Sequence, residues 1–104
     1  MIFGRKRFGD VVARQLALFE REQRDLIEEC EEAKRAYDRA DRDEAEERYG
    51  DYADLVDAGA DILADIRDHF ARTLDEAAAA EYEAAFNRAA EKRFRRFAVE
   101  LGRR

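Results

Sequence analysis

The only histidine of this 104-residue chain lies in a stretch rich in aspartate. Asp65 and His69 are four residues apart, so on a helix they share one face and can chelate one metal ion. Di-iron carboxylate bundles instead use Glu-x-x-His pairs, and the residue three positions before His69 is Ile66. The stretch also lacks the Asp-x-Asp-x-Asp-Gly turn of a calcium loop. Asp65 and His69 therefore remain candidate metal ligands, although we expect neither a metal nor another cofactor.

Residues suited to nucleophilic catalysis are scarce. Serine is absent, and Cys30 is the only cysteine. Because Cys30 falls on the apolar face of its predicted helix, we expect a small buried side chain rather than a reactive thiol. Carboxylates occur throughout the chain, so no single pair stands out as an acid–base couple. There is also no glycine-rich loop that would cradle a phosphate, and the sequence predicts no enzyme.

Aspartates recur at spacings of three and four near His69, which places them along one face of a helix. Such a row is commonly a solvated face that keeps a protein soluble. It is also suited to docking a basic partner, since carboxylates at these spacings repel one another by a few tenths of a kcal/mol per pair. We name as the candidate partner-binding strip Asp54, Asp57, Asp61, Asp65 and Asp68.

Basic residues gather near the C-terminus beside Phe94 and Phe97. Arginine interleaved with aromatic rings can grip phosphates and stack bases. Against this, the isoelectric point is about 4.9, and both phenylalanines fall on a predicted core stripe. Nucleic-acid binding is therefore the alternative function, and its candidate residues are Arg88, Lys92, Arg95 and Arg96.

Charge is distributed unevenly along the chain, whose net charge is −6. Residues 1–24 carry a net charge of +3, residues 25–83 carry −14, and residues 84–104 carry +5. We expect a flexible basic arm over residues 1–9 and a single helical domain over residues 10–104. No apolar run is long enough for a signal peptide or a membrane span, and the lone cysteine fits a reducing compartment, so we expect a cytoplasmic protein.

Apolar residues recur every three or four positions over most of the chain, a pattern typical of amphipathic helices. The apolar face shifts between Ala40 and Ala45, and Thr73 with Glu76 resembles a capping box. These features predict an all-α fold, an up-down-up antiparallel three-helix bundle with helices over about 10–40, 43–72 and 74–101. Gly59 lies on the apolar face of the second helix, where the missing side chain favours close helix packing.

This topology would place the basic residues 93–104 beside the acidic turn at 38–47, and the basic residues 5–14 beside 75–83. The charge asymmetry would then be neutralised largely within the chain. Leu, Ile, Val and Phe are few, so a homo-oligomer, with a dimer favoured, would complete the core. The function expected from the sequence is that of a small acidic protein–protein interaction or scaffold module without catalytic activity.

Overall fold

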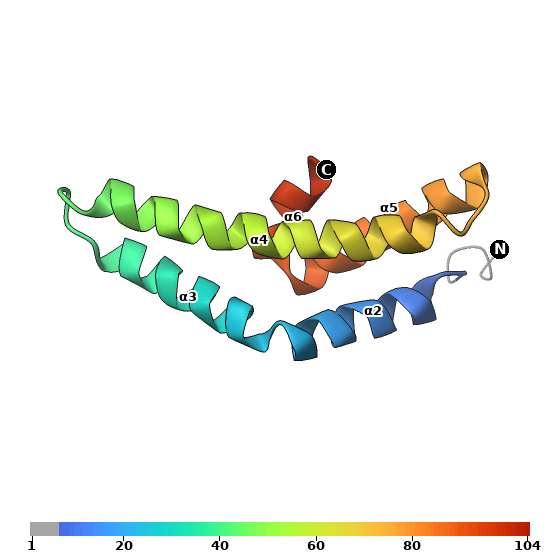
Figure 1. Ribbon diagram of the computed structural model, residues 1–104, viewed down its shortest axis with the longest axis horizontal. Helices are drawn as coiled ribbons and strands as arrows, with labels where there is room; N and C mark the ends of the chain where they lie inside the picture. The colour runs from blue at the N-terminus through green and yellow to red at the C-terminus, as the bar shows by residue number, and fades with distance from the viewer. Residues whose placement is uncertain (1–6) are drawn as a thin grey trace.

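The computed structural model of the protein describes residues 7–104, and this part of the chain is all α-helical. The predicted all-α class is therefore confirmed, whereas the predicted number of three helices is wrong. The helices are α2 (Gly9–Glu22), α3 (Arg24–Arg39), α4 (Ala45–Ala71), α5 (Glu76–Arg93) and α6 (Arg95–Gly102). Figure 1 shows that both outer segments are broken: α2 and α3 meet at a bend below the long helix α4, and α6 turns away from α5.

The predicted helix over residues 10–40 is divided at Gln23. The backbone there departs from helical values, with φ −109° and ψ 28°. α2 packs on α5, whereas α3 packs on α4. Because the two halves follow different neighbours, one straight helix cannot bury both apolar faces, and the chain bends between them.

The predicted helix over residues 74–101 is divided at Phe94, where φ is −132° and ψ is 56°. The break lets the rings of Phe94 and Phe97 both meet the ring of Phe19, with centroids 5.1 and 6.0 Å away. α6 then crosses α4 over Gly59, where an added Cβ would lie 2.5 Å from Cε1 of Phe97. The predicted close packing at Gly59 is thus confirmed, and its partner is the short helix that the sequence did not reveal.

Short turns join the remaining helices. Asp75 caps α5, since its Oδ1 accepts a hydrogen bond of 2.8 Å from the backbone N–H of Ala78. The predicted capping box of Thr73 with Glu76 is not formed, because the Thr73 hydroxyl donates to the carbonyl of Phe70 instead. At the N-terminal side α2 already begins at Gly9, inside the predicted arm, while residues 1–6 of that arm lie outside the described range.

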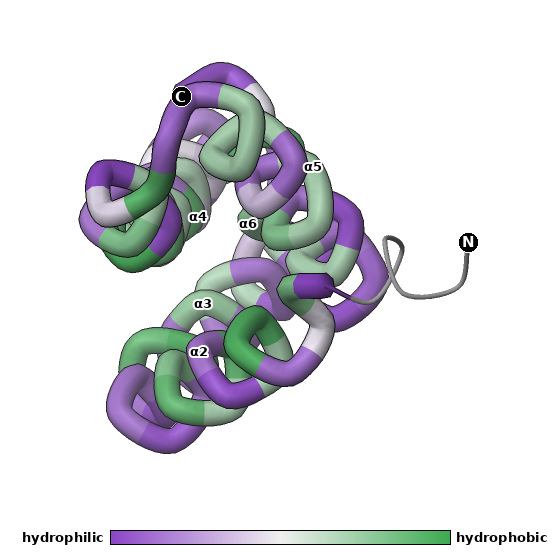
Figure 2. Tube along the Cα trace, turned by 90° about the vertical axis from the view of Figure 1, so that its right-hand side faces the viewer, coloured by the Kyte–Doolittle hydropathy of each residue, from purple (hydrophilic) through white to green (hydrophobic). Residues whose placement is uncertain are grey.

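The molecule is elongated, with extents of 53 × 23 × 22 Å and a radius of gyration of 15.8 Å. A compact domain of this length would have a radius of about 13 Å. Seen along the long axis, α4 and α5 lie on one side and α2 and α3 on the other (Figure 2). At one end α2, α5, α6 and the later half of α4 enclose a core; at the other, α3 and the first half of α4 extend alone (Figure 1). We call these the four-helix end and the two-helix end.

Candidate functional site

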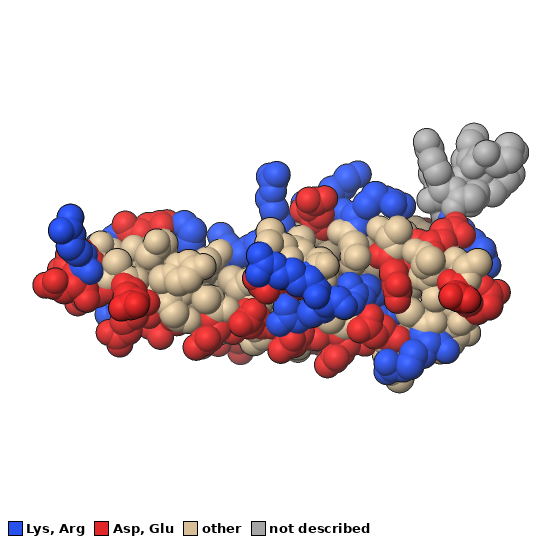
Figure 3. Space-filling model, turned by 90° about the horizontal axis from the view of Figure 1, so that it is seen from above, with Lys and Arg blue, Asp and Glu red and all other residues tan. Residues whose placement is uncertain are grey.

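The aspartate strip lies on α4, facing away from the core. Asp54, Asp57, Asp61 and Asp65 are exposed, and Asp68 is half-buried. The strip therefore lies on the surface, as the sequence predicts. Figure 3 adds that basic side chains gather in the middle of one face of the molecule, with acidic ones around them.

The C-terminal residue Arg104 lies on the strip. The Arg104 Nε donates to Asp61 Oδ1 at 2.8 Å, while its Nη2 lies 3.6 Å from Asp57 Oδ1. Its Nη1 lies 3.5 Å from Glu100 Oε2. These carboxylates raise the pKa of Arg104, the hydrogen bond to Asp61 most of all. The middle of the strip is thus partly neutralised by the chain itself.

Asp68 has a structural partner, the buried Arg67, which is only 5% exposed. The Arg67 Nε donates to Asp68 Oδ1 at 2.8 Å. Its Nη1 donates to Asn87 Oδ1 at 3.1 Å and lies 3.5 Å from the carbonyl of Leu101. Arg67 therefore ties α4 to α5 and to the end of α6, and Asp68 balances its charge.

Arg67 was not among the residues singled out from the sequence. Its position carried a usable signal: Arg67 follows the fully buried Leu63 by four residues and precedes the buried Ala71 by four. A charged residue on the apolar face at helical spacing indicates a buried charge that needs partners.

Asp65 and His69 lie at the edge of a cavity of about 650 Å³ between α2 and α4, together with Gln15. The side-chain oxygen of Gln15 accepts a 2.7 Å hydrogen bond from the hydroxyl of Tyr82. Within residues 7–104 no three His, Cys, Asp or Glu side chains come together in a way that would hold a metal ion. The two candidate ligands are therefore not joined there by a third.

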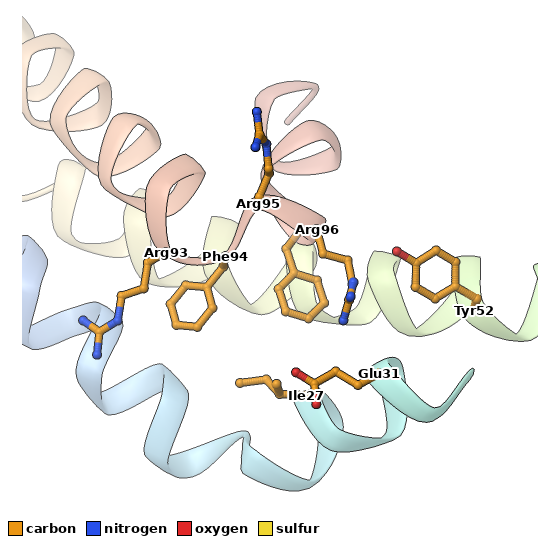
Figure 4. A pocket seen from close by; sticks show the side chains of 8 residues that line it. Ile27, Glu31, Tyr52, Arg93, Phe94, Arg95 and Arg96 are labelled. Atoms are coloured by element: carbon orange, nitrogen blue, oxygen red, sulfur yellow. The ribbon is translucent and has the colours of Figure 1, made fainter. Parts of the chain in front are cut away.

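The break at Phe94 opens a second cavity, of about 430 Å³, between the α5–α6 junction and α3. Its walls are Ile27 and Glu31 of α3, Tyr52 of α4 and residues 93–97. In Figure 4, Arg93 and Arg96 point to opposite sides of the cavity, while Arg95 points away from it. A small apolar hollow with charged side chains on its rim suits an apolar side chain of a binding partner.

The two arginines at the rim of this cavity contact different partners. The Arg93 Nη2 lies 2.8 Å from Oε1 of Glu20 on α2. The Arg96 guanidinium lies over the ring of Tyr52, 5.9 Å from its centroid. Arg96 also approaches Cys30, whose pKa is raised by burial and lowered in part by this arginine. The predicted burial of Cys30 is confirmed, since its side chain is fully enclosed.

The predicted nucleic-acid residues do not share one helix. Arg88 and Lys92 belong to α5, whereas Arg95 and Arg96 follow the break, and all four are exposed. The neighbouring rings of Phe94 and Phe97 are 8% and 3% exposed, because both pack into the core. The arginines are thus placed to meet phosphates, but the phenylalanines are not available to stack on bases.

The Phe94 cavity continues on both sides. A hollow of about 490 Å³ near the α2–α3 bend shares Ile27, Glu31 and Arg93 with it. A hollow of about 260 Å³ between α4 and α6 shares Tyr52 and Arg96. We call this row of three hollows the junction groove.

Exposed apolar residues mark the outer part of the junction groove. Tyr49 is 53% exposed and Val99 is 64% exposed, and both line the 260 Å³ hollow. Only one other large apolar residue in the described part of the chain, Leu18, is comparably exposed. Apolar side chains grouped on a concave surface are typical of protein–protein contacts.

No family model, curated protein or solved structure matches this chain. Within the described range, none of the helices has both the length and the apolar character needed to cross a lipid bilayer. Function is therefore inferred from the chain's own surfaces.

Proposed function

We propose that this protein is a small non-catalytic module that binds a partner protein through the acidic face of α4. The observation that carries this proposal is the alignment of four exposed aspartates on one face of a continuous helix. Asp54 and Asp65 form no ion pair within residues 7–104, so they remain open to a partner's cations. The fully buried lone Cys30 fits a reducing compartment, and we place the module in the cytoplasm.

Electrostatics define the partner's chemistry. Carboxylates at spacings of three and four repel each other, and a partner segment with Lys or Arg at matching spacings relieves that repulsion. Charge complementarity of this kind contributes mainly to association rate and specificity. We therefore expect binding that weakens as salt rises, to a protein segment that is basic along one helical face.

The test uses Asp54→Lys with Asp65→Lys, because this pair avoids the carboxylates that hold Arg104 and Arg67. Immobilised wild-type protein is used to capture proteins from an extract, and captured proteins are compared with those retained by the variant. We expect the variant to lose them. The matched control is Asp25→Lys with Glu29→Lys on α3, which makes the same charge change at exposed positions that do not line the cavities around Phe94. An unchanged set of bound proteins in the strip variant would overturn the proposal.

Nucleic-acid binding through Arg88, Lys92, Arg95 and Arg96 is the second candidate, supported by their exposure and by the outward direction of Arg95 (Figure 4). It ranks lower because the neighbouring phenylalanines are buried. It predicts binding of a labelled single-stranded DNA at low salt that Lys92→Glu with Arg95→Glu abolishes. Binding that survives this change would remove it.

A further inference from the structure

The two-helix end is incomplete as a helical bundle. Over this part of the molecule only α3 and α4 lie side by side (Figure 1). Along the whole of α3 only Cys30 is buried. Because the chain turns away at Phe94, α6 packs on α4 and α5 instead of continuing beside α3. The place that a third helix would take is open, and the junction groove runs along it.

The same turn separates two charged regions that the sequence predicts to be neighbours. Residues 38–47, at the tip of the two-helix end, contain six acids and two bases. Residues 88–96, at the α5–α6 junction, contain five bases and one acid. No ion pair joins these two regions in the described part of the chain, and Arg104 reaches Asp57 and Asp61 rather than the tip. The predicted neutralisation of this turn within one chain is therefore wrong.

The other half of that predicted neutralisation does occur. Arg7 Nη1 lies 3.4 Å from Oε1 of Glu81, so this one N-terminal base meets the acidic start of α5. The acidic tip and the basic junction are thus the two complementary regions that one copy leaves apart.

We propose that a second copy of this chain occupies the junction groove, packed antiparallel about a two-fold axis. In this arrangement the acidic tip of each copy lies against the basic junction of the other. The contact is made twice, as two-fold symmetry requires. The two hairpins together form a four-helix bundle, and exposed Tyr49 and Val99 become covered.

Charge and apolar surface together favour a second copy over an unrelated helix. The tip and the junction carry net charges of −4 and +4, so the surface is complementary to itself when turned by 180°. A partner with only a basic or only an acidic helix would match one region and be repelled by the other. Asp57 of the partner-binding strip lines the outer hollow of the groove, whereas Asp54 and Asp65 line none of the three hollows, so these two positions test the strip without altering the groove.

The test measures mass in solution by light scattering after gel filtration. For the wild type we expect twice the chain mass of 12.1 kDa at low salt, and a shift toward the monomer at high salt. Two charge-reversal variants separate the contacts: a tip variant, Asp43→Lys with Glu46→Lys, and a junction variant, Arg93→Glu with Arg96→Glu, at the two arginines that line the groove. All four positions are exposed, so the fold of one chain should persist.

Each variant alone brings the net charge of its altered region to zero, so the charge attraction is lost at both contacts of its homodimer. We expect the dissociation constant of the dimer to rise by on the order of a hundredfold. In an equimolar mixture the mixed dimer regains one contact in full, because the unchanged tip of one variant meets the unchanged junction of the other while the two altered regions meet without net charge. The mixture should therefore regain the doubled mass.

Asp54→Lys with Asp65→Lys is the matched control, which should remain dimeric while it loses the partner proteins of the strip. Val99→Glu supplies an independent readout without reversing either charged region, and we expect it to be monomeric with an unchanged far-ultraviolet spectrum. A wild-type protein that stays monomeric at low salt across accessible concentrations would overturn the proposal. So would single charge-reversal variants that remain dimeric, or a mixture that fails to re-form the dimer.

Discussion

The two ends of the molecule use the same kind of helix with different outcomes. At the four-helix end, Leu16, Phe19, Leu63, Tyr82 and Phe86 are almost completely buried. At the two-helix end, α3 has a clear apolar face but only one buried residue. An amphipathic pattern indicates which face is apolar, whereas the number of neighbouring helices decides how deeply that face is buried.

Polar contacts follow the same division. At the four-helix end they join distant parts of the chain, as Arg67 does with Asn87 across twenty residues. At the two-helix end the shortest ion pair among the described residues is local, 2.8 Å between Lys34 Nζ and Asp38 Oδ1 on adjacent turns of α3. We therefore expect the free energy of unfolding to depend mainly on the four-helix end, and the two-helix end to be available for association.

The largest effect is expected from Phe86→Ala. The ring of Phe86 is fully buried and lies 6.0 Å from the ring of Tyr82. Its removal leaves a cavity and should lower the free energy of unfolding by about 3–5 kcal/mol. Tyr37→Ala, the matched change at the two-helix end, removes a half-buried ring 5.4 Å from that of the exposed Tyr49 and should have a clearly smaller effect. Urea unfolding of both variants checks this, and equal losses would contradict the comparison.

The next largest effect is the loss of stability at high pH that is caused by ionisation of Tyr82. Burial raises the pKa of Tyr82 to about 12. An unfolded tyrosine has a pKa of about 10, so above that pH the unfolded chain loses the phenolic proton before the folded one does. The contribution of the protonated Tyr82 to the free energy of unfolding is therefore fully present below pH ~10. It falls by roughly 2–3 kcal/mol as the pH rises to ~12.

The measurement compares unfolding free energies of the wild type and Tyr82→Phe at pH ~9 and pH ~11.5. The variant loses the hydrogen bond to Gln15 and should be somewhat less stable at the lower pH. It should also show a shallower decline between the two values, because no phenol remains to ionise. Parallel declines would show that Tyr82 is not the group responsible.

Smaller changes in stability, of opposite sign, are expected when two glycines of α4 are replaced by alanine. Gly59→Ala places a methyl group against the ring of Phe97 and should destabilise by about 1–2 kcal/mol, after the gain in helix propensity is subtracted. Gly50→Ala meets nothing within 4 Å and should stabilise by about 0.5–1 kcal/mol. Thermal unfolding of both variants tests this, and two changes of the same sign would contradict it.

Periodicity and charge were enough to predict the helical class, the central helix and the burial of Cys30. The breaks at Gln23 and Phe94 were not predictable in the same way. Neither involves proline or glycine, and both arise because different halves of one amphipathic segment pack on different helices. Local sequence does not encode which neighbour a face will meet.

The candidate binding surfaces were likewise predictable only where they depend on the spacing of residues within one helix. Helical spacing correctly placed the aspartate strip on the outside of α4. It did not reveal that Arg104 would reach Asp61, because the turn at Phe94 brings the C-terminus there. The junction groove was also missed, since it exists only where that turn leaves α3 without a third helix.

The smallest change in the free energy of unfolding is expected when a single cation is removed at each end of the molecule. Arg104 lies among three carboxylates, those of Asp57, Asp61 and Glu100, and its side chain is 26% exposed. Arg104→Gln should lower the free energy of unfolding by about 0.5–1 kcal/mol at low salt, at the upper end for a partly exposed ion-pair network. Dissolved ions screen the repulsion among the aspartates of the strip and thereby offset part of that loss.

Lys34→Gln is the matched change at the two-helix end, where a single pair with Asp38 should contribute only about 0.3–0.5 kcal/mol. Both losses should shrink as salt is added, since both pairs face solvent. The difference between the variants should shrink with them, because Arg104 engages more carboxylates than Lys34 does. Urea unfolding of both variants at two salt concentrations decides this. A larger loss for Lys34→Gln would mean that ion pairs, unlike apolar contacts, stabilise the two-helix end more than the four-helix end.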